Sequence, residues 1–578
     1  MASYLSDSIL TYLNEMIDWD GYFQHRKGDS VDVDAERAAM QGVLETCAEI
    51  CAEIEPEARD GWEIAAKLQQ GEVTTPVHIA RGYERLKEAG LVALSVSEEY
   101  GGFELPAFIN SIVLQMIARA DAGLMTIVGL QSGVAEDIQE YGSEEIKQEY
   151  LPRFCSGEVQ GAMDLTEPHA GSDLGSITTR ATERDGRHFL QGEKIFITNG
   201  GSEIHLVLAR DDDHFEESKG TTKGLSLYLC PRTLPDGSKN PISVERLEHK
   251  LGIHGSPTAA IRFDEAEGFL IGERGNGFKA MLNLMNNARL GVAAQGIGIA
   301  EAALVKAIEY ARERKQFGFP IAQQPLMKNM ISRMVTDVEG SRALLYRTSV
   351  LVDRTRALEN YLERDGDKIS DAERGEIEQQ IERNNVRIRL LTPLAKYLGT
   401  ETCDTITRMA IQIHGGIGFM ADSEVGRLHL DGIITTIYEG TSEIQISFAL
   451  KEIGKGALNV VFDEISLELD KLTSDPLAAL GEKVRRGIEL IHEAEPALLQ
   501  DFGYALLCSR HVAEMVIVVI VAAELLKQAA ADSKREDLAT AWINRKMLEL
   551  EMHAKRVSEG TVEQIERCER LVDLFEGQ

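Results

Sequence analysis

The 578-residue sequence is short of positive charge, of cysteine and of long apolar runs. Its 61 Lys and Arg residues stand against 94 Asp and Glu residues, which gives a formal net charge of −33. Nucleic acids and anionic membranes bind basic faces, so this balance argues against both as partners. A local basic pocket could still bind a phosphorylated ligand, while the acidic surface favours solubility.

Cysteine is scarce, with seven residues scattered along the chain. Cys47 and Cys51 stand four apart, on one face of an expected helix, but no second Cys or His pair completes a metal-ligating pattern. The sequence therefore predicts buried free thiols in a reducing compartment and no metal site.

The longest uninterrupted apolar run, Met515 to Ala523, has nine residues and is flanked by two glutamates. A membrane-spanning helix needs about 20 apolar residues. The first residues have neither the basic segment nor the long apolar segment of a signal peptide. We therefore expect no integral membrane segment and a cytoplasmic location, with peripheral membrane contact as the alternative.

Helical periodicity is abundant and is interrupted once. Apolar residues recur at helical spacing through residue 157, over 276–453 and over 454–578, whereas 158–275 contains short segments rich in Ile, Leu, Val and Thr. We predict a mostly helical α+β protein with an N-terminal helical domain, a middle β barrel or sandwich, a helical bundle with an exposed hairpin at 354–386, and an added C-terminal helical region. The expected strands are 186–190, 194–198, 203–209, 224–230 and 258–263, and the expected C-terminal helices are 476–494, 498–528 and 538–559.

A carboxylate followed by Gly-Thr stands at the entrance of a predicted helix, in the sequence Tyr438-Glu439-Gly440-Thr441. Glycine lets another molecule approach the backbone closely. A carboxylate in an apolar setting has a raised pKa and can act as a base. A surface glutamate in a helix cap is the commoner explanation of such a triplet in isolation, so its meaning depends on the motifs around it.

Two stretches of the β region favour a planar ligand. The Gly- and Ser-containing turn at 163–173 can offer backbone N–H groups and a hydroxyl to a phosphate or a polar ring edge. Phe196 and Thr198 stand two residues apart, which on a regular strand places them on one face. A flat apolar wall beside a hydrogen-bond donor suits a heteroaromatic cofactor; a β-turn and a buried Phe are the alternative.

The second helical region adds two further motifs. In 314–318 a basic cluster meets an aromatic residue, where Arg314 could bind a phosphate or cap a helix. In 412–419 a glycine turn follows His414. A lone histidine beside glycines is more often structural than catalytic.

Taken in order, these motifs resemble the acyl-CoA dehydrogenase family of flavoproteins over roughly residues 60–452. The resemblance implies that family's fold, with FAD between the domains. The N-terminal extension and His169 are similar to extended members, in particular methylmercaptopropionyl-CoA dehydrogenase-like enzymes; very-long-chain acyl-CoA dehydrogenases also carry a C-terminal region. The five motifs are Thr166-Glu167-Pro168 with Gly171-Ser172-Asp173, Lys194 to Gly200, Arg314 to Gly318, Gln412 to Gly416, and Tyr438 to Thr441.

The resemblance also implies the FAD contacts. The 163–172 segment, with Phe196 where many relatives have Trp, would line the isoalloxazine ring and the pyrophosphate. Thr166 would face the pyrimidine edge, and Thr198 would hydrogen-bond flavin N5. A further group would hold the adenosine diphosphate half across a subunit interface, and Gln324 stands near the displaced position of a usual family Gln. The residues implied are Met163, Leu165, Thr166, Gly171, Ser172, Phe196, Thr198, Arg314, Phe317, Gln324, Gln412, Gly416, Thr441 and Glu443.

For the acyl-CoA substrate, the resemblance implies contacts from Ser172, Asn286, Arg289 and Gly440. Glu439 would remove the α-proton of the thioester while the β-hydrogen leaves as hydride to flavin N5. The Glu439 N–H and a ribityl hydroxyl would stabilise the developing enolate. Some relatives place the base just before the helix arginine, where this chain has Ala288, which cannot take a proton.

The resemblance further implies an electron-transfer flavoprotein as electron acceptor and a homo-oligomer, with a C2 dimer preferred to a tetramer. An acyl-CoA oxidase that uses O2 and a 3-methylthiopropionyl-CoA-type dehydrogenase are the alternatives. A non-catalytic nucleic-acid-binding flavoprotein is a further alternative, against which the acidic charge and the intact Glu439-Gly440-Thr441 weigh.

Overall fold

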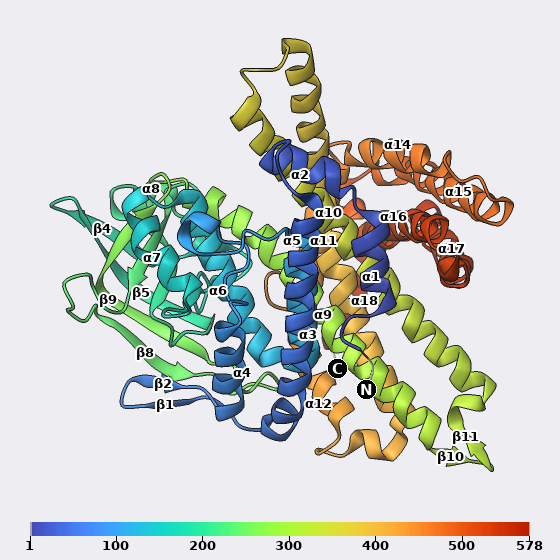
Figure 1. Ribbon diagram of the computed structural model, residues 1–578, viewed down its shortest axis with the longest axis horizontal. Coiled ribbons are helices and arrows are strands. Elements are labelled where there is room, and N and C mark those ends of the chain that lie inside the picture. The colour runs from blue at the N-terminus through green and yellow to red at the C-terminus, as the bar shows by residue number, and fades with distance from the viewer. Residues whose placement is uncertain (1–2, 577–578) are drawn as a thin grey trace. The chain divides into compact units, whose positions relative to one another are not determined.

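The computed structural model describes residues 3–576, without the side chains of His214, Asn283, Leu284, Asn286 and Asn287, and groups the chain into two compact units (Figure 1). Unit 1 contains the chain up to Leu5, Ala38–Lys306 and Ala410–Thr435. Unit 2 contains Ser6–Arg37, Ala307–Met409 and the chain from Thr436 onward. The chain therefore crosses from one unit to the other five times, near residues 5, 37, 306, 409 and 435.

The helical part of unit 1 agrees with the helical prediction for the first 157 residues, apart from one small hairpin. Gln70 and Gly71, at φ 54° and 82°, form its turn. Strands of three residues are too short to show alternation, so periodicity misses this hairpin. The elements are α3 (Val33–Gly61), β1 (Lys67–Gln69), β2 (Glu72–Thr74), α4 (Val77–Glu88), η2 (Glu98–Tyr100), α5 (Ala107–Ala120), α6 (Ala122–Tyr141), α7 (Glu144–Cys155) and, later in the chain, η6 (Gly415–Phe419) and α12 (Glu424–Ile433).

The β region of unit 1 closes into a barrel. Strand β6 pairs with β4, β4 with β5, β5 with β9, β9 with β7, and β7 returns to β6; β3 and β8 add to β6 and β9. Closure leaves an interior of small and branched apolar side chains, among them Val207, Ala259 and Ile261. The elements are β3 (Gly161–Asp164), η3 (Leu174–Ser176), β4 (Arg180–Arg184), β5 (Arg187–Thr198), β6 (Ile204–Asp211), η4 (Asp212–His214), α8 (Phe215–Ser218), β7 (Leu225–Pro231), β8 (Ile242–Leu247) and β9 (Thr258–Ile271).

Unit 2 is a helical assembly that includes the C-terminal region. Its hairpin is formed by the ends of two long helices, and Ser370 caps the second one by accepting the Glu373 N–H at 3.2 Å. Three helices, α3, α9 (Gly277–Glu313) and α11 (Asp371–His414), run from one unit into the other, as does η7 (Ile434–Thr436). The remaining elements are α1 (Asp7–Thr11), η1 (Tyr12–Met16), α2 (Trp19–Lys27), β10 (Lys315–Gln316), β11 (Phe319–Pro320), η5 (Ile321–Gln323), α10 (Pro325–Asp365), α13 (Ser442–Ile453), α14 (Ala457–Leu469), α15 (Asp475–Leu498), α16 (Phe502–Ala531), η8 (Ser533–Arg535), α17 (Glu536–Glu559) and α18 (Glu563–Glu576).

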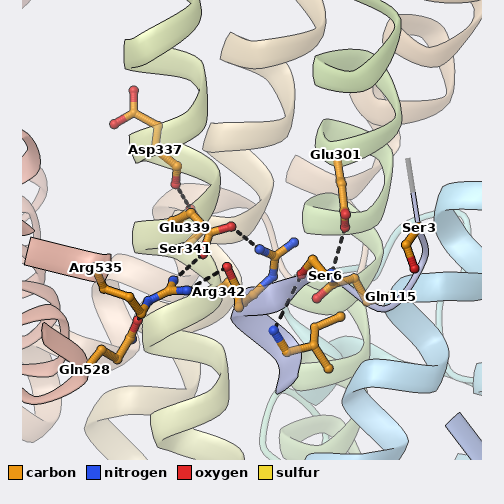
Figure 2. Close-up of polar contacts among 12 residues, drawn as sticks. Ser3, Ser6, Gln115, Glu301, Asp337, Glu339, Ser341, Arg342, Gln528 and Arg535 are labelled. Atoms are coloured by element: carbon orange, nitrogen blue, oxygen red, sulfur yellow. Dashed lines mark hydrogen bonds and ion pairs between the residues drawn. The ribbon is translucent and has the colours of Figure 1, made fainter. Parts of the chain in front are cut away.

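The C-terminal helices pack on the rest of unit 2 through both apolar and charged contacts. Helix α16 lies against α10, α13, α14, α15 and α17. Buried Arg347 of α10 donates to Glu468 of α14 and Glu524 of α16, both at 2.9 Å. Figure 2 shows a second connection, in which Arg535 reaches Glu339 of α10 at 2.8 Å and donates to Gln528 at 2.9 Å. These helices therefore belong to the core of the unit.

Two of the described helical segments, Ala288–Glu313 and Phe502–Ala531, are long and apolar enough to cross a membrane. Their apolar windows are 78% and 72% buried inside the structure. A helix that is apolar on all sides also forms the centre of a large helical core, and their burial accounts for their composition in that way.

Candidate active site

Glu439 stands in a tight turn between η7 and α13. Its φ is 56° and that of Gly440 is 95°, so both residues adopt the left-handed backbone conformation. Glycine reaches this conformation freely, whereas for glutamate it is uncommon and costs about 1–2 kcal/mol. A strained residue of this kind persists only where its surroundings hold it, and such residues cluster at functional sites.

Two buried polar side chains hold this turn. Gln445 of α13 donates from Nε2 to the carbonyl oxygens of Glu439 and Gly440, at 2.8 and 3.1 Å. Lys396 of α11 donates from Nζ to the Gly440 carbonyl at 2.8 Å. Both donors are fully buried, while the Glu439 side chain remains half-buried at the turn. The arrangement fixes the backbone and leaves the carboxylate partly accessible.

Sequence reasoning missed Gln445 and Lys396. Gln445 lies on the buried face of α13, where an amide side chain needs hydrogen-bond partners. A glutamine on the apolar face of a predicted helix was therefore a signal in the sequence that could have indicated its role. Lys396 is far from the turn in sequence, so only the folded structure brings it there. Thr441, at the N-cap position of α13, makes no side-chain capping bond, and Glu443 is exposed in the first turn.

In unit 1 the segment containing Thr166 is tied to β5. The Ile195 N–H donates to the Thr166 carbonyl at 2.8 Å. Lys194 Nζ donates to the Leu165 carbonyl at 2.9 Å and to Glu167 at 3.0 Å. The structure therefore brings together Leu165, Thr166 and the strand that carries Phe196.

Glu167 anchors the same segment. Its carboxylate also accepts the N–H groups of Thr178 and Thr179, at 2.7 and 2.9 Å. Burial alone would raise its pKa, but the Lys194 ammonium and these hydrogen bonds bring the pKa down to about 2. Glu167 is thus a charged structural anchor beneath the turn that leads to the exposed Gly171 and Ser172.

Strand β5 is irregular at Phe196. The register with β9 shifts between Lys194 and Ile197, and Phe196 has φ 58°. This bulge interrupts the alternation on which the shared face of Phe196 and Thr198 was predicted. Phe196 is 61% exposed, so it is not the buried Phe of the alternative interpretation. Thr198 is half-buried and pairs with Thr258.

The other predicted cofactor and substrate residues are distributed over both units. Arg314, Phe317 and Gln324 lie on and beside the β10–β11 hairpin in unit 2, with Phe317 90% exposed. Gln412 and Gly416 are exposed at the end of α11 and in η6, in unit 1. Also in unit 1, Met163 is buried in an apolar cluster, Arg289 is 4% exposed on α9, and the side chain of Asn286 lies outside the described residues.

His414 does not behave as an isolated catalytic side chain. Its Nδ1 donates to the carbonyl of Ala410, one turn earlier on α11, at 2.8 Å. This bond within the helix supports the structural interpretation of His414.

A cavity of about 80 Å³ in unit 1 lies apart from these motifs. Within the described part of the chain, its lining includes no residue predicted for the flavin or the substrate. Its buried Asp431 accepts the Ile253 N–H at 2.5 Å and Trp62 Nε1–H at 2.8 Å, and burial raises the pKa of this carboxyl to about 7. No group of three or more His, Cys, Asp or Glu residues among the described side chains could hold a metal ion.

Family models match the chain in three consecutive parts. The acyl-CoA dehydrogenase N-terminal domain matches residues 41–158, the middle domain 162–266, and the C-terminal domain 275–362 and 376–454. The interval in the last match, 363–375, coincides with the turn between α10 and α11. The hairpin therefore extends beyond the common family core.

Known proteins similar to this chain agree with these matches. The 3-methylmercaptopropionyl-CoA dehydrogenase of Ruegeria pomeroyi is 33% identical over 72% of this chain and 70% of its own length. A chain in the structure of the electron transferring flavoprotein of Acidaminococcus fermentans is 28% identical, with a TM-score of 0.59, over 72% of this chain and 97% of that chain.

One similar structure spans the C-terminal region as well. The acyl-CoA dehydrogenase of Bacillus anthracis, solved in complex with FAD, is 24% identical with a TM-score of 0.75, over 96% of this chain and 93% of that chain. At this identity the likeness shows the fold alone, including the added C-terminal helices. On the family matches and the 33% identity, the chain belongs to the acyl-CoA dehydrogenase family of FAD-dependent oxidoreductases.

Proposed function

We propose that this protein oxidises an acyl-CoA thioester to the 2-enoyl-CoA, with Glu439 as the base that removes the α-proton. The observation that carries the proposal is the strained turn at Glu439, whose carbonyls are fixed by Gln445 and Lys396. A rigid backbone holds the carboxylate in one direction, as proton transfer at a fixed carbon requires. A bound acyl chain would complete the burial of this side chain and exclude water from it.

The residues of unit 1 fit FAD. An exposed aromatic ring on a bulge, Phe196, lies on the strand that is tied to the Thr166 segment, and this combination suits a planar ring with a polar edge. Met163, Leu165, Gly171, Ser172 and Thr198 of the same unit would add the contacts that the family implies there, and Thr441 and Glu443 of unit 2 are the other contacts that the family implies. When bound, FAD supplies a two-electron acceptor for the oxidation.

The substrate is an acyl-CoA thioester, with Arg289, Asn286, Ser172 and Gly440 as the proposed contacts. The relative from Ruegeria pomeroyi favours 3-methylthiopropionyl-CoA as one candidate to include in a substrate panel. We propose an electron-transfer flavoprotein as the acceptor of the electrons, and the match to the Acidaminococcus fermentans structure supports this partner. A low yield of peroxide under air would separate this reaction from that of an oxidase.

We also propose a cytoplasmic homodimer in which each subunit contributes to the cofactor site of the other. Phe317 is 90% exposed at the tip of the β10–β11 hairpin, and an aromatic side chain in that position suits a contact with a second molecule. Arg314 and Gln324 beside it, together with Gln412 and Gly416, would hold the adenosine diphosphate half of FAD.

Glu439→Gln tests the proposed base, because it keeps the size of the side chain but removes its basicity. The variant should fold, stay yellow and bind acyl-CoA, while the rate of flavin reduction falls by at least ~10²–10⁴-fold. Stopped-flow bleaching of the flavin under anaerobic conditions, over a panel of acyl-CoA substrates, measures this rate. His414→Asn is the control and should keep most of the activity. Reduction of Glu439→Gln at the parent rate would show that another group is the base.

A further inference from the structure

Arg510 of α16 connects the C-terminal region with the segment that follows Glu439. All of its contacts lie within unit 2. Arg510 donates from Nη2 to Glu401 of α11 at 2.8 Å and from Nε to the hydroxyl of Tyr397 at 3.0 Å. Its Nη1 lies 3.5 Å from Glu443 Oε1, in the first turn of α13. One guanidinium therefore connects the C-terminal region with two helices of the family core.

Glu401 in turn contacts the start of α13. Its second carboxylate oxygen accepts the hydroxyl of Ser442 at 2.6 Å. Ser442 is the first residue of α13 and follows Glu439-Gly440-Thr441 directly. Arg510 thus contacts the segment after Glu439 by two routes, through Glu401 to Ser442 and directly to Glu443.

The contacts are arranged so that the turn is held from both sides. Lys396 and Gln445 bind the carbonyls of the turn, whereas Glu401 and Arg510 bind the side chains of the residues that follow it. Tyr397 keeps Arg510 in place from α11, and its own hydroxyl donates to Glu514, one turn further along α16. Arg510 of α16 therefore contacts both α11 and α13.

We propose that Arg510 is a positioning residue for Glu439, by which the C-terminal region sets the catalytic geometry of the family core. This inference rests on the proposed function of Glu439. Arg510 fixes Glu401 and Glu443, these fix the first turn of α13, and the turn fixes the direction of the Glu439 carboxylate. A displacement of about 1 Å at a reacting group can cost as much as ~10²-fold in rate.

Because the Arg510 side chain is partly exposed, its proposed role in positioning Glu439 can be tested without unfolding the protein. The side chain of Arg510 is 47% exposed, so its removal leaves no deeply buried charge behind. Exposed ion pairs contribute little to the stability of a protein. Loss of Arg510 should therefore leave the fold nearly as stable as before, and its effect should fall on the turn.

Arg510→Gln in the full-length, FAD-loaded protein tests the proposal. We expect the limiting rate of flavin reduction by acyl-CoA to fall about 10-fold, with the KM for acyl-CoA, the flavin content and the melting temperature close to those of the parent. Arg510→Lys keeps one ion pair and should recover part of the rate. Because both residues act through the same contact, Arg510→Gln combined with Glu401→Gln should be no slower than the slower single variant.

Arg486→Gln is the matched control. Arg486 of α15 has a similarly exposed side chain, at 48%, and also pairs with two carboxylates, Glu489 and Glu493. It should reduce its flavin at the parent rate. A parent rate in Arg510→Gln would overturn the proposal, and so would an equal loss in Arg486→Gln or a loss of bound flavin. Retention of activity in Glu439→Gln would instead refute the proposed function, so the two failures are distinguishable.

Discussion

At the scale of single residues, the turn at Glu439 has a strained backbone that is held by hydrogen bonds. A left-handed glutamate is followed by a left-handed glycine, and both carbonyls are taken by buried donors. The donors cost free energy to bury unless they make these bonds. The turn and its donors therefore stabilise each other, and neither can be replaced alone without loss.

Gly440→Ala tests whether the turn at Glu439 tolerates any side chain at its glycine. The added Cβ would lie 2.5 Å from Gln445 Nε2, and the φ of 95° is unfavourable for alanine. We expect the free energy of unfolding to fall by about 1–3 kcal/mol and flavin reduction to slow more than stability alone explains. Urea denaturation and stopped-flow reduction measure the two effects.

Gly375→Ala is the control for that substitution. Gly375 lies half-buried within α11, and a Cβ there would meet no atom within 4 Å. Alanine should stabilise this position by roughly 0.5–1 kcal/mol, because glycine is a poor helix former. Equal stability and equal rates in the two variants would show that the turn at Glu439 is not constrained.

A local motif marks Glu439 in the sequence, and the family resemblance that this motif supports is confirmed, while the role of Glu439 as the base stays a prediction. The roles assigned to the individual cofactor and substrate residues stay predictions. Lys396 and Arg510 could not be predicted, because the residues that they contact are distant from them in the sequence, whereas Gln445 carried one signal, an amide on the buried face of a helix. Phe196 shows a further limit, since alternation along a strand cannot reveal a bulge.

At the scale of elements, strand β5 depends on a buried ion pair between Lys194 and Glu167. The pKa of Glu167 is lowered to about 2, so its charge stabilises the fold above pH 4.5, and this contribution is lost as pH falls from about 4.5 to about 2. Burial lowers the pKa of Lys194, although Glu167 opposes this effect. The ion pair as a whole therefore contributes less to the free energy of unfolding than the pKa shift of Glu167 alone would suggest.

Lys194→Met should break this arrangement. Glu167 would remain buried without its cation, and the free energy of unfolding at pH 7 should fall by about 3–5 kcal/mol. The pKa of Glu167 should rise, so the loss of stability between pH 4.5 and 2 should shrink. Urea denaturation over a pH series measures both. The exposed pair of Lys147 with Glu144 provides the control, since Lys147→Met should cost no more than about 1 kcal/mol.

Helices and long strands could be predicted well from periodicity, whereas short elements could not. The expected strands at 203–209 and 224–230 correspond closely to β6 and β7. Strands β3, β4 and β8 were missed, as was the β1–β2 hairpin. Barrel closure follows from the pairing of β6 with β7, which depends on register between strands and leaves no local signal.

At the scale of the whole molecule, the mostly helical α+β fold and the added C-terminal helices are confirmed. The division at residues 157, 275 and 453 stays a prediction. The family models match three consecutive parts of the chain, while the structure groups the chain into two units whose segments alternate along the sequence. Sequence position alone cannot show such alternation, because it follows from packing between distant segments.

Deletion after Lys455 tests the place of the C-terminal region. The deletion removes α14–α18 and uncovers the apolar side chains of unit 2 that α16 covers, together with the buried Arg347. We expect the shortened protein to aggregate and the full chain to sediment as a flavin-containing dimer. A deletion after Gly560 removes only α18, in which the described residues include no buried one, and should stay soluble. A soluble, dimeric and active product of the longer deletion would contradict this view.

The repeated crossing of the chain between the units has a consequence for synthesis on the ribosome. Residues 6–37 belong to unit 2, whose other segments begin at residue 307 and continue to the C-terminal helices. Helix α2, with Trp19 and Phe23 buried in the finished protein, packs on α10 and therefore leaves the ribosome long before its partner exists. At typical translation rates of about 5–20 residues per second, these side chains stay without that partner on the order of tens of seconds. An N-terminal segment of this kind is the part of the nascent protein on which a chaperone would act first.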